Sequence, residues 1–433
     1  MKQALIVFMK YPEAGKVKSR LAGKIGPIAA TDVYWKLLYR TLGIVDDFKH
    51  CSPEVEVFVF FSPGERKNEV KRHFPGPWKF IPQAGCNLGE RMSAAFRQLW
   101  DSGYDRVVII GTDIADLNVN DLREAFDGIA YGTSVIGPAE DGGFYLLGLS
   151  SSSDLPFKYD SWGDGSIFDR TYRSLEKLGT VRVIKKRRDI DREEDLAYFQ
   201  SSPFFQSKIS VVIPFLSERE KLVGLVSLLC DQIWPGDEVI AIKGTEDPQV
   251  YCETVDPGFT LCFSPKGRGK QLNLGAKIAS GDTLWFLHVD SKPPANFGYH
   301  VRKILALEKK AVGCFKLAFD TDSRTLRAIA RWANIRTRLL KLPYGDQGIF
   351  CSRETFMLIG GFKKEYLMED VDFVRKCRKL GGLLVVPREL YSSPERYLKR
   401  GLLMASLQNH ILMTLYLMGV DDKKLYRIYY RKL

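Results

Sequence analysis

The chain has 433 residues, 45% hydrophobic and 12% aromatic, which predicts two or three folded domains and excludes an intrinsically disordered protein. Its formal net charge of +12 favours anionic ligands such as phosphates, nucleotides or acidic lipid surfaces. The basic residues are dispersed and no nucleic-acid motif accompanies them, so a nucleic-acid partner is not expected.

The cysteines and the apolar windows predict a cytoplasmic protein. Eight cysteines are scattered without a CxxC pair, so buried free thiols in a reducing compartment are the simplest account. No window reaches the roughly 20 apolar residues of a membrane helix. The closest is residues 411–420, which we expect to be a packed helix. The alternative is a helix on the inner face of a membrane, flanked by Arg400 and Lys423.

The chain divides into two halves of similar layout. Residues 4–9 and 209–214 each read as the first strand of a sheet. Serines, a proline and amides between the halves indicate a boundary, so we expect domains at 1–202 and 207–433. Each half alternates short apolar runs with amphipathic segments. This alternation predicts α/β domains with mostly parallel sheets flanked by helices.

A basic loop follows the first strand of the first half. A glycine among several cations at that place suits a triphosphate or pyrophosphate. A solvated basic loop is the alternative. The candidate residues are Lys10, Gly15, Lys16, Lys18 and Arg20.

Three acidic motifs follow in the first half. GTDIADL places an acid after an inner strand, and GPAEDGGF puts two acids before glycines that a sugar or nucleoside could approach closely. RRDIDREEDL carries two acids that complete a metal site or cap a helix. The candidates are Asp113, Glu140, Asp141, Gly142, Asp189 and Asp191.

With GCNLGERM at residues 85–92, these motifs make residues 1–198 resemble the DUF2064 family of GT-A-like proteins. That family is related to 2-phospho-lactate guanylyltransferase and to molybdenum-cofactor nucleotidyltransferases. The resemblance implies a nucleotide-binding loop between Lys10 and Arg20 and a metal-bearing Asp113.

In the second half, GRGKQLNLGAKIASGD precedes an apolar strand expected at residues 283–289. Its glycines allow close backbone approach to phosphates, and Arg268 carries charge toward them. The strand runs into Asp290. Ligands of open α/β sheets lie beyond the carboxyl ends of the strands, where a carboxylate can hold a divalent cation. An Asp that caps the next turn is the alternative.

Two later motifs place acids where an acceptor could bind. LPYGDQGIF sets Asp346 and Gln347 between two glycines, either as polar contacts for a sugar or as an ordinary turn. Glu369 and Asp370 follow a GGF turn at the start of a helix. The helix dipole favours acids there, but adjacent acids also suit a general base that deprotonates an acceptor hydroxyl.

Residues 209 to about 430 therefore resemble the family 2 glycosyltransferases, which have the GT-A fold, and within them the subgroup associated with arsenosugar biosynthesis. The resemblance implies that Asp290 binds the metal and the nucleotide diphosphate. It implies that Asp370 is the base of an inverting transfer, supported by Glu369. Lys243 stands where the family usually has an Asp that reads the base. The implied donor-binding residues are Pro214, Glu218, Lys243, Gly267, Arg268, Gln271, Asn273, His288, Asp346 and Gln347.

The sequence thus predicts a glycosyltransferase that depends on Mg2+ or Mn2+. It would move a sugar from a nucleotide sugar to a small-molecule or lipid acceptor, with a nucleotide-binding transferase domain before it that takes a nucleoside triphosphate or a nucleotide sugar. One alternative is a second glycosyltransferase in the first half. The other is a nucleotidyltransferase in the first half, with the second half as a non-catalytic binding module.

Overall fold

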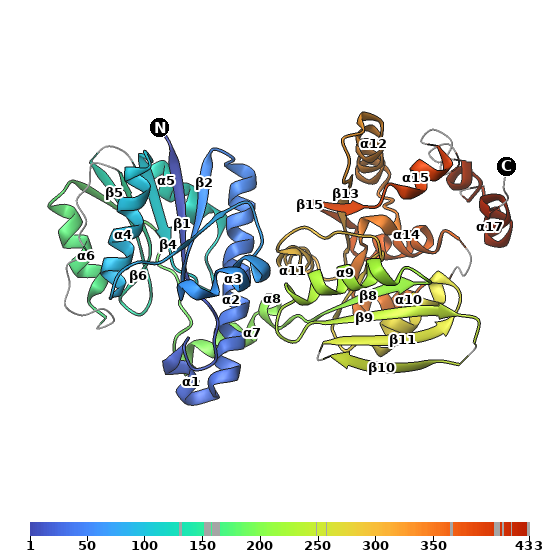
Figure 1. The fold of residues 1–433 in the computed structure, drawn as a ribbon, viewed down its shortest axis with the longest axis horizontal. Helices are drawn as coiled ribbons and strands as arrows, with labels where there is room; N and C mark the ends of the chain where they lie inside the picture. The colour runs from blue at the N-terminus through green and yellow to red at the C-terminus, as the bar shows by residue number, and fades with distance from the viewer. Residues whose placement is uncertain are drawn as a thin grey trace. The chain divides into compact units, whose positions relative to one another are not determined.

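The computed structural model describes the chain except residues 130–131, 151–156, 158–164, 248, 257, 364–366, 402–407, 409–410, 417 and 431–433. The chain forms two compact units, Met1–Phe205 and Gln206–Leu433 (Figure 1).

The described residues of the first unit form a seven-stranded sheet in the order β3-β2-β1-β4-β6-β5-β7. β6 runs antiparallel to β4 and β5, and the other adjacent pairs are parallel. The strands are β1 (Gln3–Lys10), β2 (Val55–Ser62), β3 (Lys79–Pro82), β4 (Arg106–Ile110), β5 (Thr133–Pro138), β6 (Phe144–Ser150) and β7 (Thr180–Val183).

Helices cover this sheet because their apolar residues recur three and four positions apart. Met92, Phe96 and Leu99 of one helix share a core with Ile6 and Ile109 of the sheet. The described helices are α1 (Ser19–Ile25), α2 (Pro27–Cys51), α3 (Lys67–His73), α4 (Leu88–Asp101), α5 (Val119–Gly128), α6 (Ile167–Glu176), α7 (Leu196–Ser201) and α8 (Pro203–Gln206).

The described residues of the second unit form an eight-stranded sheet in the order β10-β11-β9-β8-β12-β14-β13-β15. β14 runs antiparallel to β12 and β13. The strands are β8 (Ile209–Phe215), β9 (Glu238–Thr245), β10 (Tyr251–Asp256), β11 (Phe259–Pro265), β12 (Thr283–Phe286), β13 (Val312–Phe319), β14 (Phe350–Ser352) and β15 (Leu383–Ser392).

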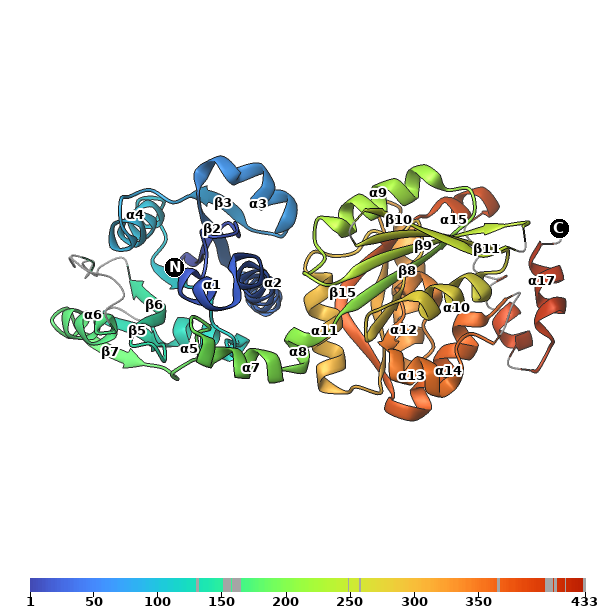
Figure 2. The ribbon, with the colours of Figure 1, turned by 90° about the horizontal axis from the view of Figure 1, so that it is seen from below.

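Alternate residues of the central strand β8 enter two separate cores. Val211 packs with Leu225 of α9 and Val301 of α11, whereas Val212 packs with Leu272 of α10 and Phe373 of α14. α9 and α10 accordingly lie on opposite faces of the sheet (Figure 2). The described helices are α9 (Arg219–Cys230), α10 (Arg268–Ile278), α11 (Phe297–Leu307), α12 (Arg324–Leu340), α13 (Arg353–Ile359), α14 (Glu369–Gly381), α15 (Glu395–Arg400) and α17 (Asp422–Tyr430).

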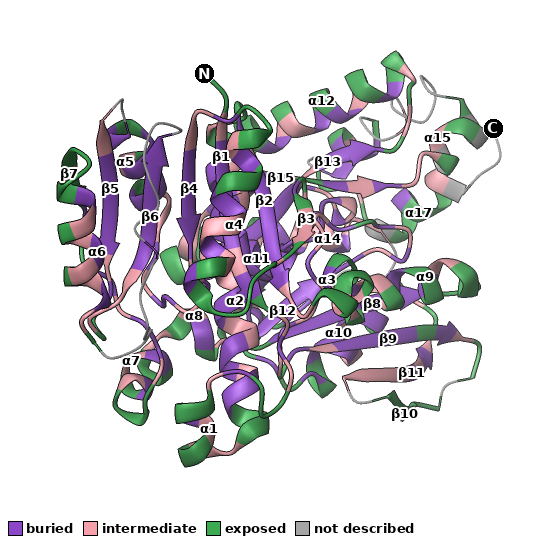
Figure 3. Ribbon diagram, turned by 60° about the vertical axis from the view of Figure 1, so that its left-hand side comes forward, coloured by how far each residue is buried: buried purple, intermediate pink, exposed green. Residues whose placement is uncertain are grey.

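The two sheets share one topology. Apart from the extra strand β10, which pairs antiparallel with β11, each sheet has the same sequence of strands and the same single reversed strand, β6 or β14. The predicted fold class, two tandem GT-A-type α/β domains with mostly parallel sheets, is confirmed. In both units the strands are largely buried and the exposed residues concentrate on helices and loops (Figure 3).

Two local expectations are corrected. The strand expected at residues 283–289 ends at Phe286, because the chain turns after Leu287, so Asp290 lies in a turn beyond the strand. The free-thiol account is wrong for Cys252 and Cys262, which face each other across β10 and β11 and form a disulfide. Of the other cysteines, only Cys314, Cys351 and Cys377 are buried.

The helix expected at residues 411–420 is helical at 411–416 and packs into the second unit. Leu412, Met413 and Tyr416 are buried in one core with Val371 and Leu425. No helix within the described ranges is long and apolar enough to cross a membrane.

A buried ion pair fixes the start of β8. The Arg302 guanidinium donates to Asp237 and to Ser207 O, and it lies 4.1 Å from the Trp234 ring centroid. The Asp237 carboxylate also accepts from Ile209 N at 2.8 Å. Both charged side chains are almost fully buried, so each depends on the other for compensation.

We expect Arg302→Leu to destabilise the second unit by about 3–5 kcal/mol, because it leaves the Asp237 carboxylate buried and unpaired. Urea unfolding read by hydrogen exchange of β8 peptides would separate this unit from the first. Lys309→Leu, at a side chain 74% exposed, is the matched control. Equal stability of the two variants would contradict the role assigned to the pair.

Candidate functional site

A cluster of charged side chains forms at the carboxyl end of the second sheet. Its members come from the turn after β12, the first turns of α10 and α14, and the short helix η3 (Gly345–Gln347). The backbone sets this arrangement, because parallel strands present their carboxyl ends at one edge. Arg268, His288 and Asp370 lie within electrostatic range of Asp346, and His288 also contacts Asp290.

Asp290 is held as a carboxylate. His288 Nδ1 lies 3.1 Å from Asp290 Oδ1, within ion-pair distance. Burial raises the pKa of Asp290, but contact with His288 and the charge of Lys221 lower it more, so the pKa falls below its usual value. Beyond this contact with His288, Asp290 Oδ1 is buried without a further hydrogen-bond partner among the described residues. A buried anionic oxygen of this kind is a ready ligand for a cation.

Glu369 and Asp370 begin α14 and differ in surroundings. Asp370 Oδ2 accepts from Gly345 N at 2.6 Å, and Asp370 Oδ1 accepts from Val371 N at 2.8 Å. Glu369 is buried, with Oε1 3.3 Å from Arg268 Nε. Burial and the Asp370 charge raise the pKa of Glu369 to about 7, although Arg268 opposes them. Glu369 therefore titrates near neutrality.

Asp346 is a second acid of the cluster whose surroundings disfavour its charged form. Burial raises its pKa, and the charge of Asp370 adds to this, while Arg336, His288 and Arg268 oppose it. Asp346 Oδ1 is buried without a hydrogen-bond partner among the described residues. A buried acid oxygen without a partner points to a ligand that supplies positive charge or donors.

Three predicted donor-binding amides support the backbone instead of facing outward. Gln271 Nε2 donates to Phe215 O and Ile242 O at 2.9 and 2.7 Å, which joins the ends of β8 and β9. Asn273 exchanges two hydrogen bonds with the backbone of Phe362. Gln347 is fully buried and donates to Phe315 O at 3.0 Å.

The remaining donor-binding candidates lie around the strand ends. Glu218 accepts from Leu216 N and Ser217 N, and its pKa is lowered because these bonds outweigh burial. Pro214 is buried in β8, and Gly267 caps α10 with a φ of 138° that favours glycine. Lys243 is exposed on β9, with its ammonium 6.0 Å from the Phe263 ring centroid.

The first unit has a pocket of about 720 Å³ at the carboxyl end of its sheet. Lys18 Nζ lies 3.3 Å from Asp113 Oδ2 and 4.0 Å from Asp191 Oδ1. Arg20 Nη1 donates to Asp191 Oδ2 at 2.9 Å. The pocket also has Lys10, Asp141 and Asp189 in its lining. The predicted basic loop and three acidic motifs thus meet at one place.

Asp189 is the most perturbed acid of this pocket. Backbone hydrogen bonds from Ile190 N to Asp113 O and from Ala115 N to Arg188 O hold its segment beside the end of β4. Burial, then the charges of Asp141 and Asp113, raise the pKa of Asp189 to about 6. A cation placed among these acids would relieve their repulsion.

Four candidates of the first unit lie outside the pocket lining. Glu140 pairs with Arg188, and Lys16 pairs with Glu13 at 2.6 Å. Gly142 has a φ of +88°, and a Cβ there would lie 2.1 Å from Gly165 O, so glycine is required for this close approach. Gly15 also has a positive φ, but a Cβ there would meet open space.

Sequence reasoning missed two residues that shape the first pocket. Tyr34 of α2 contacts Lys10 N and Thr112 Oγ1 at 3.1 and 3.0 Å, and burial raises its pKa to about 12. Gln83 Nε2 donates to Met9 O and Phe60 O. Tyr34 lies in an ordinary amphipathic helix, and nothing in the sequence marks it as a pocket residue. For Gln83, the one sequence feature that could have indicated a role is its position directly after a strand.

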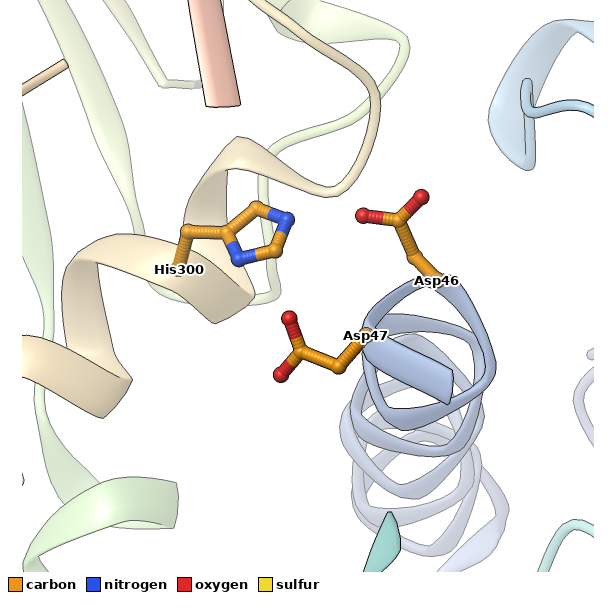
Figure 4. A group of neighbouring side chains, drawn as sticks. All are labelled: Asp46, Asp47 and His300. Carbon is orange, nitrogen blue, oxygen red and sulfur yellow. The ribbon is translucent and has the colours of Figure 1, made fainter. Parts of the chain in front are cut away.

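Figure 4 draws Asp46 and Asp47 of α2 with His300 of α11. The two acids belong to the first unit and the histidine to the second. We therefore assign them to no common metal site.

Comparisons with known proteins identify both halves. Residues 49–164 match the model of DUF2064, an uncharacterized protein family conserved in bacteria. Residues 210–363 match the model of glycosyl transferase family 2. The chain joins a DUF2064 domain to a family 2 glycosyltransferase domain. A search of curated protein sequences gave no match.

Solved structures similar to the chain include a candidate nucleotide-diphospho-sugar transferase from Desulfovibrio desulfuricans G20. It is 30% identical over 47% of this chain and 88% of its own, with a TM-score of 0.43. The mannosyltransferase PcManGT from Pyrobaculum calidifontis, solved with GDP-Man and Mn2+, is 16% identical over 55% of this chain and 77% of its own, with a TM-score of 0.39.

We expect the stability of the second unit to fall as pH rises, because the folded state holds a proton on Glu369. The pKa is raised from 4.5 to about 7, so this stabilisation is fully present below pH 4.5 and lost as pH passes about 7. Its size is at most roughly 3 kcal/mol. Glu369→Gln should remove the slope in urea unfolding read at α14 by hydrogen exchange. An unchanged slope would contradict the assignment, and Glu354→Gln is the exposed control.

Proposed function

We propose that the second unit is a metal-dependent, inverting glycosyltransferase that takes a nucleotide sugar as donor. One observation carries the proposal. Asp346 buries a carboxylate oxygen without a hydrogen-bond partner among the described residues, and Asp290 buries one that contacts His288, in the same cluster as the Glu369–Asp370 pair. The family 2 match over residues 210–363 gives the cluster its chemical context.

The donor set fits a hard divalent cation such as Mg2+ or Mn2+. Such ions take carboxylate oxygens, and the lowered pKa of Asp290 keeps its carboxylate ready to bind. A cation held there would neutralise charge on the departing nucleoside diphosphate. Asp290 is thus the proposed metal residue. Arg268 at the start of α10 adds a guanidinium that suits a phosphate oxygen.

Asp370 is the proposed base. Each of its oxygens already accepts one backbone N–H, which fixes the carboxylate in orientation, and each can accept a second bond. The acceptor hydroxyl would give its proton to Asp370 as it attacks the sugar carbon. Glu369 would support this by holding Arg268 in place.

The first unit is proposed to bind a nucleoside triphosphate or a nucleotide sugar. Lys10, Lys18 and Arg20 supply cationic groups for phosphates, and Asp113, Asp189 and Asp191 supply oxygens for a divalent cation. The chain would then carry two activities, one in a domain at 1–202 and the other in a domain at 207–433. The second candidate function is a guanylyltransferase-like first unit with a non-catalytic second unit, which the exposed Lys243 in place of a base-reading Asp favours.

The acceptor is proposed to be a small molecule or a lipid, with arsenosugar-type chemistry as the leading class from the subgroup resemblance. A cytoplasmic location would give access to nucleotide sugars.

We expect Mn2+-dependent binding of at least one nucleotide sugar, which must raise the melting temperature of the second unit. Asp290→Asn should weaken that binding by about tenfold or more, because it removes an anionic ligand oxygen. The measurement is calorimetric titration of the full chain with UDP- and GDP-sugars, with and without Mn2+. Asp256→Asn, at an exposed residue of β10, is the control. Identical binding in all three proteins would refute the Asp290 assignment.

For the first unit, we expect Mn2+ affinity in the presence of a nucleoside triphosphate to fall on acidification. Metal and proton compete for Asp189, whose pKa is about 6. The loss between about pH 7.5 and about pH 5.5 should be roughly fourfold for one proton. Titrations in an Asp290→Asn background isolate this site.

Asp189→Asn in that background should bind Mn2+ more weakly and lose the pH dependence. An unaltered pH dependence would mean that Asp189 is not a ligand.

A further inference from the structure

The helix α12 (Arg324–Leu340) has one face packed in the core and an opposite face with large exposed side chains. Leu326, Ala330 and Ala333 are buried, and they pack with Leu317 and Phe319 of β13. The helix stands at one side of the second unit in Figure 1 and shows exposed residues along its outer side in Figure 3.

The outer face of α12 carries two stripes. Trp332, Ile335 and Leu339 recur three and four residues apart and are 53%, 41% and 73% exposed. The neighbouring stripe is basic and recurs at the same spacings. It consists of Arg324, Arg327, Arg331 and Arg338, all exposed.

The basic stripe is not neutralised within the fold. Arg324, Arg331 and Arg338 have no acidic side-chain partner in the part of the chain that the structure describes. The same arginines line a pocket of about 1490 Å³ between α12, β13 and β15, together with the acids Asp320, Asp322 and Glu389. The lining contains none of the predicted site residues. A pocket lined by guanidinium groups suits phosphate oxygens.

We propose that α12 is an interfacial helix that binds an anionic lipid surface. The apolar stripe would enter the headgroup region, and the arginines would contact lipid phosphates from the adjacent side. The three apolar side chains of the stripe are few for a protein partner. A stable protein interface uses roughly 20–30 residues per side and buries about 800 Å² on each partner. They are sufficient for shallow insertion, which the arginines strengthen by their attraction to lipid phosphates.

This surface differs from the one that the sequence suggested. Residues 411–416 bury Leu412 and Met413 against the second unit, so that segment offers little apolar surface. The inference does not depend on the transfer chemistry, because α12 contributes none of the carboxylates of the candidate site.

The test is co-sedimentation of the full chain with vesicles of phosphatidylcholine, alone or with about 30% phosphatidylglycerol. We expect binding only to the anionic vesicles, weakened by about 0.5 M salt. Arg331→Glu with Arg338→Glu should lower the partition coefficient about tenfold or more. Trp332→Ser with Leu339→Ser should lower it as well. Melting temperatures equal to that of the unaltered protein would show that each variant is folded.

Lys423→Glu with Lys424→Glu changes the net charge equally on α17 and should bind as the unaltered protein does. Absence of binding, equal binding to neutral vesicles, or equal loss in the α17 variant would overturn the proposal. Self-association abolished by the α12 substitutions without vesicle binding would identify a second copy of the chain as the occupant, and would overturn it too.

Discussion

Carboxylates crowded at the carboxyl end of a parallel sheet repel one another, and in the second unit nearby cationic groups such as Arg268 and Arg336 offset this repulsion only in part. Arg268 and His288 stand among Asp290, Asp346, Glu369 and Asp370. Burial, together with the charge of Asp370, raises the pKa of Glu369 and Asp346, and Asp346 Oδ1 is buried without a hydrogen-bond donor in the described part of the chain. Such stored repulsion is released when a cation and a phosphate-bearing ligand bind.

The same arrangement recurs in the first unit with different chemistry. There the acids Asp113 and Asp191 already contact Lys18, so the pocket is closer to charge balance. In both units a glutamine side chain ties together the first two strands of the sheet at their carboxyl ends. Gln83 does so in the first and Gln271 in the second. The two units therefore share both their topology and a glutamine that links the first two strands near the candidate site.

Sequence patterns predicted the strands that are buried on both faces, because an uninterrupted apolar run has few alternatives. β1 and β8 were predicted within one residue at each end. Edge and reversed strands such as β7 and β14 were not predicted, because their short segments depend on neighbours for pairing. The turn that carries Asp290 also begins earlier than expected. β12 ends where its pairing with β8 and β14 ends, although the apolar run continues beyond that point.

The acids of the candidate sites were predicted because the sequence indicates where strands end and where helices begin. The amides Gln271, Asn273 and Gln347 were read as ligands, yet they bond to the backbone, a distinction that only long-range geometry can make. The contact of Tyr34 with the end of β1 spans 24 residues and has no local signature.

The most direct test of the account is transfer of a labelled sugar from a nucleotide sugar, with Mn2+, into small-molecule and lipid extracts, analysed by mass spectrometry. The unaltered protein should form a labelled product, and Asp370→Asn should lower turnover about 10²–10⁴-fold while donor affinity stays the same. A variant that transfers sugar at the original rate would contradict the central claim that the acids of this edge are an active site.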